Sequence, residues 1–140
     1  MNKKKLAAAV IIVFILLLLT NFLIHNVILS SVYSKPEISK AFRGMEDMTR
    51  MMWRLWIADL VWSFFFVFIF VKGYENKGII EGIRYGIYIG LFMNFIAAVA
   101  QNVTYFIPYY LALQWFIYGL IQSVILGIAA ALIYKPKPKT

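Results

Sequence analysis

Four long apolar stretches constrain this chain more than any other feature. They cover residues 6–30, 52–71, 79–100 and 109–134. Each is about 20 residues or longer, and a helix of that length, rising about 1.5 Å per residue, crosses roughly 30 Å of hydrocarbon. Together the stretches occupy most of the chain. The sequence therefore predicts an all-α integral membrane protein with one transmembrane domain, a four-helix bundle over residues 1–140.

Composition excludes several classes of protein. Hydrophobic residues make up 63% of the chain, above the roughly 45–50% of soluble domains. There is no cysteine, which excludes disulfides, thiolate metal sites and haem attachment through cysteines. The net charge of +8 resides at the ends of the apolar stretches and between them, where basic residues contact anionic lipid headgroups. We therefore expect the lipid bilayer as a partner, and no nucleic acid.

The basic residues also predict an orientation. An even number of crossings places both termini on one side, which then carries nine lysines and arginines against five on the other. The nine are Lys3, Lys4, Lys5, Lys72, Lys77, Arg84, Lys135, Lys137 and Lys139, and the five are Lys35, Lys40, Arg43, Arg50 and Arg54. Because cytoplasmic loops carry the excess of positive charge, we expect both termini in the cytoplasm.

The connection between the first two stretches predicts a short amphipathic helix over about residues 37–51, lying on the outer membrane surface. Apolar residues recur there every three or four positions, with charged residues between them. The apolar residues are Ile38, Phe42, Met45, Met48 and Met52.

The methionines of this segment suggest a second interpretation. Thioethers are soft ligands suited to Cu(I), so Met45, Met48 and Met51, together with His25, are the candidate metal ligands. Adaptable apolar packing at the membrane surface is the alternative. His25 is the only histidine, which excludes a bis-histidine haem or a zinc site with several histidines within one chain. The sequence assigns no cofactor.

Small residues at a spacing of four mark the last two stretches. The third carries Gly82, Gly86, Gly90, Asn94 and Ala98, and the fourth carries Trp115, Gly119, Ser123, Gly127 and Ala131. Small residues let helix backbones approach closely in lipid. We expect these two helices to form the closest pair, antiparallel, with Gly82 opposite Ala131, Gly86 opposite Gly127 and Gly90 opposite Ser123. Homodimerisation through residues 82–90 is the alternative.

Polar residues interrupt all four stretches at a similar depth, in the outer half of the membrane. These are Asn21, His25, Asp59, Ser63, Asn94, Gln114 and Tyr118. A carboxylate at that depth is costly unless it is paired, protonated or hydrated, and His25 is the expected partner of Asp59. The pair is either a structural bond between two helices or part of a binding site. In the inner half, Gln122 is the notable polar residue.

Three segments carry a resemblance to a known group of proteins. They are NFLIHNVILSSVY, KGYENKGIIEGIRYGIYIGL and LALQWFIYGLIQSVILGIAAALIYKP. With them the chain resembles a family of small, uncharacterised prokaryotic inner-membrane proteins with four helices. The resemblance implies fold and membrane residence, and it implies no activity.

Three functions remain open, and the leading one is a non-catalytic subunit or accessory protein. Such a protein would pack within a larger membrane complex, with other membrane subunits or copies of itself as partners. The second is a membrane protein that binds a quinone, haem or metal through the polar residues Asn21, His25, Asp59, Asn94, Gln114 and Tyr118. The third is a small oligomeric transporter with Asp59 as its coupling carboxylate. No catalytic constellation is recognisable, so the sequence does not predict an enzyme.

Overall fold

The computed structural model describes residues 2–135, and this part of the chain is helical, without strands. The elements in order are α1 (Lys3–Phe22), the π-helical segment η1 (Leu23–Ile28), α2 (Ser30–Tyr33), α3 (Pro36–Ser39), α4 (Met45–Lys72), α5 (Ile79–Gly90), the π-helical segment η2 (Leu91–Phe95), α6 (Ile96–Thr104) and α7 (Tyr109–Ile133). The basic tail residues Lys137 and Lys139 lie outside the described residues.

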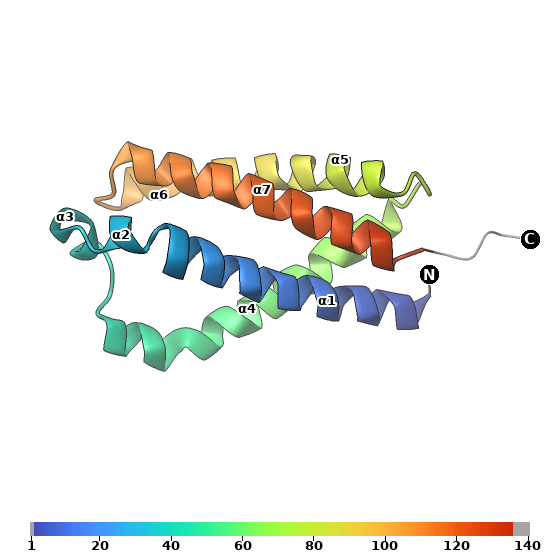
Figure 1. Ribbon diagram of the computed structural model, residues 1–140, viewed down its shortest axis with the longest axis horizontal. Helices are drawn as coiled ribbons and strands as arrows, with labels where there is room; N and C mark the ends of the chain where they lie inside the picture. The colour runs from blue at the N-terminus through green and yellow to red at the C-terminus, as the bar shows by residue number, and fades with distance from the viewer. Residues whose placement is uncertain (1, 136–140) are drawn as a thin grey trace, which may run out of the picture.

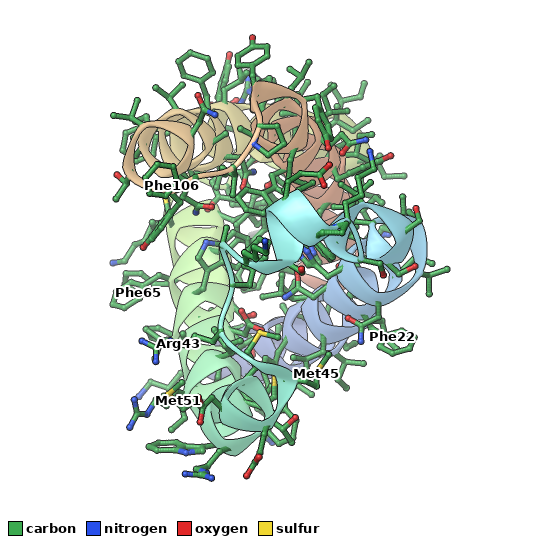
Figure 2. All side chains as sticks on the ribbon, turned by 90° about the vertical axis from the view of Figure 1, so that its left-hand side faces the viewer. Phe22, Arg43, Met45, Met51, Phe65 and Phe106 are labelled. Atoms are coloured by element: carbon green, nitrogen blue, oxygen red, sulfur yellow. The ribbon has the colours of Figure 1, made fainter. Side chains whose placement is uncertain are left out.

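Four continuous helical spans are long and apolar enough to cross a membrane. They are Lys3–Ile28, Met45–Lys72, Ile79–Thr104 and Tyr109–Ile133. The prediction of an all-α integral membrane protein is confirmed to this extent. Their perimeter is apolar too, since Phe22, Phe65 and Phe106 point away from the molecule on different sides (Figure 2).

The segment predicted as one surface helix is divided in the structure. Its first residues lie in α3, and its last, from Met45 onward, form the first two turns of α4. The sequence from Met45 through Met51 and Met52 to the end of the helix contains no glycine or proline. No helix-breaking residue therefore ends the helix where the sequence changes from charged to apolar. The second span is therefore seven residues longer at its start than the apolar stretch at 52–71.

The helix α7 has neighbours on two sides, with α5 packed closely along one and α1 along the other (Figure 1). The helix α4 packs mainly on α1 and crosses it at an angle, so that its first half diverges from the other helices. Both described ends of the chain lie at the same end of the molecule, where the backbone N–H of Asn2 donates to Tyr134 Oη at 3.3 Å.

An apolar core holds three helices together at the end that carries the termini. Its buried members include Ala9, Val13 and Leu17 from α1, Phe66, Val67 and Phe70 from α4, and Leu126, Ala130 and Ala131 from α7. The Tyr85 hydroxyl donates to the Phe66 carbonyl at 2.6 Å and so ties α5 to α4. This core holds the second half of α4.

Glycines bring α5 and α7 into backbone contact along what we call the glycine seam, formed by Gly82, Gly86 and Gly90 with Ser123 and Gly127. A Cβ at Gly82 would overlap the Gly127 carbonyl and lie 2.8 Å from Ala131 Cβ. A Cβ at Gly86 would overlap the Ser123 carbonyl. The expected faces meet, but the register is shifted from the expected pairs: Gly82 is nearest Gly127 and Gly86 is nearest Ser123. The contacts leave no room for a side chain at Gly82 or Gly86.

A second, smaller core lies at the opposite end, beneath α2 and α3. Its buried residues are Ile24, Leu29, Ile38, Ala98, Ile107, Leu111 and Ala112. The segment from α2 to α3 folds across this end of the molecule and is anchored by Ile38, which is fully buried. It thereby places Tyr33 against Trp115 of α7.

Candidate functional site

A pocket of about 300 Å³ lies between α1, η1, α6 and α7, in the half of the molecule covered by α2 and α3. Three of the four spans contribute polar side chains to it. These are Asn21, His25, Asn94, Gln101, Tyr118 and Gln122. The aromatic face of Trp115 and the small residues Ala97 and Gly119 complete much of the wall. Its volume is at the lower end of the ~300–1,000 Å³ of small-molecule pockets.

Both π-helical segments border this pocket. His25 lies in η1 and Asn94 lies in η2, and both side chains line the pocket. A π-helical turn contains an extra residue, which redirects the side chains that follow and weakens the regular ladder of backbone hydrogen bonds. Such turns occur frequently at functional sites. Two of them around one pocket distinguish this region from the rest of the molecule.

A chain of hydrogen bonds fixes the imidazole of His25. The Trp115 indole N–H donates to Tyr33 Oη at 2.7 Å, and Tyr33 Oη lies 2.6 Å from His25 Nδ1. The indole can only donate, so Tyr33 Oη accepts there and its phenolic hydrogen is free to point at Nδ1; in that arrangement Nδ1 accepts. This tautomer carries its proton on Nε2. Burial raises the pKa of the Tyr33 phenol, although the bond from Trp115 opposes the shift, so the phenol stays neutral.

A second polar network joins three helices. Gln122 Nε2 donates to Thr20 Oγ1 at 2.7 Å and to Asn21 Oδ1 at 2.9 Å. Asn21 Nδ2 in turn donates to Asp59 Oδ2 at 3.3 Å. Asp59 is thus connected to the pocket through the amide of Asn21, while its own side chain lies outside the pocket lining.

Asn94 occupies the place where the glycine seam ends. Its Nδ2 donates to Ser123 Oγ at 3.3 Å, and Ser123 Oγ donates to the Gly119 carbonyl at 2.8 Å. A Cβ at Gly119 would lie 2.6 Å from Asn94 Cγ. Gly119 therefore accommodates the Asn94 side chain at the edge of the pocket.

The structure brings four of the six predicted polar site residues to the pocket, namely Asn21, His25, Asn94 and Tyr118. The expected contact between His25 and Asp59 is wrong, because His25 is bonded to Tyr33 and Asp59 to Asn21. Gln114 is also outside the lining, and its buried Oε1 has no hydrogen-bond partner among the described residues.

Sequence reasoning missed four residues of this region. Gln122 is bonded to α1 and lines the pocket, although depth along the helix assigned it to the other half of the membrane. Gln101 and Trp115 line the pocket, and Tyr33 orients His25. Trp115 offered a signal, since a large side chain interrupts a stripe of small ones there. Tyr33 offered none, because its position depends on how α2 and α3 fold back.

The candidate metal ligands are not gathered into one site. Met45 and Met51 lie on different sides of the first turns of α4 (Figure 2), while His25 lies in η1 against Tyr33. Met51 Sδ accepts from Arg54 Nη1 at 3.6 Å. Within residues 2–135 no group of three or more histidine, aspartate or glutamate side chains is arranged to hold a metal ion.

Comparison with known proteins identifies no relative of this chain, so a proposed function has to be based on the pocket. No family model matches the chain. The search of curated proteins and the search of solved structures likewise find no match. The resemblance carried by the three sequence segments therefore stays a prediction.

Proposed function

We propose that this chain is an integral membrane protein that binds a small amphipathic molecule in the pocket between α1, α6 and α7. The convergence of polar side chains from three spans on one pocket supports the proposal. Polar groups within a membrane are costly unless they have partners. The side chains of Gln101 and Tyr118 line the pocket and are only partly buried, so their polar groups are accessible to a bound molecule.

The same proposal includes the membrane setting. The four spans would form a bundle with lipid around its apolar perimeter, both termini in the cytoplasm and the pocket in the outer half of a prokaryotic inner membrane. The excess of lysine and arginine near the termini supports this orientation. An amphipathic ligand would then enter from the bilayer, which concentrates such molecules at the depth of the pocket.

Native mass spectrometry of the gently solubilised protein, with an optical spectrum and solvent extraction, tests the proposal. We expect a bound small molecule on the wild type and on Ala100→Phe, and none on Ala97→Phe. Ala97 lines the pocket, while Ala100 is an exposed alanine on the same helix that does not line it. A protein without any bound molecule, or equal occupancy of the two variants, would overturn the proposal.

A second candidate function is the accessory subunit of a larger complex, and the first half of α4 favours it. Three successive residues there are more than half exposed, Leu55 at 58%, Trp56 at 55% and Ile57 at 54%. Successive residues point about 100° apart, so the helix is uncovered on nearly all sides. A neighbouring subunit would cover this surface.

Co-purification tests the second candidate. A polypeptide that stays bound to the wild type should be lost on Trp56→Ala and kept on Phe106→Ala. Phe106 is 96% exposed and lies in the connection between α6 and α7, so it is a matched aromatic control. Purification of the chain as a monomer, in mild detergent and in nanodiscs alike, would contradict a role as a subunit.

A further inference from the structure

We infer that the pocket takes the head group of a lipid-soluble quinone, an uncharged ring with oxygen atoms on opposite sides and an apolar tail. This inference rests on the proposed ligand-binding function and names the class of ligand. It combines the charge, the hydrogen-bonding groups and the size of the pocket.

Charge excludes most lipid head groups. Among residues 2–135, no lysine, arginine, aspartate or glutamate lines the pocket. The carboxylate of Asp59 is turned to Asn21 and stays outside the lining. A phosphate or carboxylate would therefore enter a membrane pocket without a counter-charge, which is strongly unfavourable. The ligand head group is polar and neutral.

Hydrogen-bond donors lie on different helices around the pocket. When Tyr33 donates to Nδ1, His25, on the α1 span, presents Nε2–H to a ligand. Gln101 on α6 and Tyr118 on α7 line the pocket and carry further donors. A quinone presents two carbonyl acceptors at opposite ends of its ring, so donors on separate walls match it better than they match an alcohol with one oxygen atom.

The remaining wall suits a flat ring. Trp115 and Tyr118 are one helical turn apart on α7 and both line the pocket, and aromatic faces favour stacked or edge-on rings. A volume of about 300 Å³ is at the lower limit for small-molecule pockets. The ring occupies the pocket, and the tail leaves it along the apolar surfaces of the helices.

Three decyl-tailed probes separate the features of the ligand. They are a decyl-benzoquinone, decylbenzene and decylphosphocholine, titrated against the full-length protein in nanodiscs while the tryptophan emission is recorded. We expect saturable quenching by the quinone and at least about tenfold weaker binding of both other probes, because one lost hydrogen bond of about 1.4 kcal/mol corresponds to that factor. Equal binding of decylbenzene, or tighter binding of decylphosphocholine, would overturn the inference.

Variants test the role of His25 directly. His25→Leu should weaken quinone binding about tenfold and leave decylbenzene binding unchanged. Asn26→Leu, the next residue in η1 and outside the pocket lining, is the matched control and should bind as the wild type does. Equal quinone affinities of His25→Leu and the wild type would show that the imidazole does not bind the quinone.

Tyr33→Phe tests the positioning of the imidazole. We expect nitrogen NMR of the wild type to show a protonated Nε2 and an unprotonated Nδ1 at His25, and Tyr33→Phe to give a mixture of tautomers with weaker quinone binding. An unchanged tautomer would contradict the positioning role. If native mass spectra show a bound molecule of another class and the quinone does not bind, this inference fails while the proposed function stands. If no molecule binds at all, both fail.

Discussion

The two halves of the antiparallel pair formed by α5–η2–α6 and α7 carry the same spacing of residues and differ in structure. In one half, Gly82 and Gly127 bring the backbones into contact. In the other half, Asn94 and Trp115 occupy the corresponding stripe positions and line the pocket, which α1 and η1 also border, while Ala98 packs with Leu111 and Ala112 in the second core. A repeat of four residues therefore sets which faces meet, while the size of the residues at those positions determines how closely the helices approach.

The difference also places the π-helical segment. The span is a regular α-helix along the glycine seam and becomes π-helical from Leu91 to Phe95, where the seam ends. The extra residue changes the phase of the side chains in α6, so that Gln101 reaches the pocket. Close packing and the proposed binding pocket thus occupy different halves of one helix pair.

A substitution in the glycine seam should have the largest effect on the stability of the protein. Gly82→Ala places a Cβ against the Gly127 backbone, which cannot yield without separating the helices. We expect a loss of about 2 kcal/mol or more, although alanine is by itself the better helix former by about 1 kcal/mol. Unfolding in detergent should be compared with that of Gly73→Ala, whose Cβ would lie 3.8 Å from the Ile69 carbonyl oxygen. Equal midpoints would refute backbone contact in the seam.

Polar bonding between the spans should have a smaller effect, and its sign should depend on the residue. Gln122→Leu removes two hydrogen bonds between α7 and α1 and should cost about 1 kcal/mol. Gln114→Leu on the same helix removes an unpartnered buried oxygen and should be neutral or stabilising. If the two variants lose the same free energy of unfolding, the network around Gln122 contributes nothing specific.

A glycine-to-alanine substitution beside the pocket should destabilise the protein less than one in the glycine seam. Gly119→Ala meets the end of the Asn94 side chain, which can rotate, where Gly82→Ala meets backbone. We expect a loss below about 1 kcal/mol together with weaker ligand binding. The ratio of the two losses in unfolding measurements is the readout, and a larger loss for Gly119→Ala would reverse the comparison.

The ion pairs in the connection between α4 and α5 should have the smallest effect on the stability of the protein. Ion pairs with Lys77 and Arg84 lower the pKa of the Glu75 carboxyl from 4.5 to about 2. Because the folded pKa is the lower one, this contribution is present above pH 4.5 and is lost as the pH falls toward 2. The wild type should lose slightly more stability over that range than Glu75→Gln does, and high salt should abolish the difference.

A glutamate at the other end of the molecule provides the control for the pH dependence attributed to Glu75. Glu37 lies in α3 and forms no ion pair within residues 2–135. Glu37→Gln should follow the wild type across the same pH range. A pH dependence shared by Glu75→Gln and the wild type would show that the exposed pairs do not stabilise the loop.

The sequence predicts the spans and the pairing of α5 with α7 because both depend on local regularities. Length and apolarity define a span, and glycines four residues apart define the seam. Counting residues along straight helices predicts a similar membrane depth for four polar side chains, Asn21, His25, Asn94 and Tyr118. The structure places all four at the pocket.

The rest depends on features without a local pattern. No proline marks η1 or η2 in the sequence, and Gly90 before η2 is one of several glycines in a span that is otherwise a regular helix. Asp59 is bonded to Asn21, whereas His25, four residues further along the same span, is bonded to Tyr33. Tyr33 reaches His25 only because Ile38 anchors the returning segment.

Disulfide trapping in this cysteine-free chain tests the central comparison most directly. The pairs Gly90→Cys with Ser123→Cys and Ala98→Cys with Trp115→Cys occupy equivalent positions on the two stripes. A Cβ at Gly90 would lie 3.2 Å from Ser123 Cβ, close to the separation that a disulfide requires, whereas Ala98 and Trp115 both line the pocket. We expect rapid cross-linking of the first pair and slower cross-linking of the second, because α6 and α7 meet in the second core but without the backbone contact of the glycine seam. Equal cross-linking of both pairs would show that the helices are closed along their whole length and would contradict the pocket.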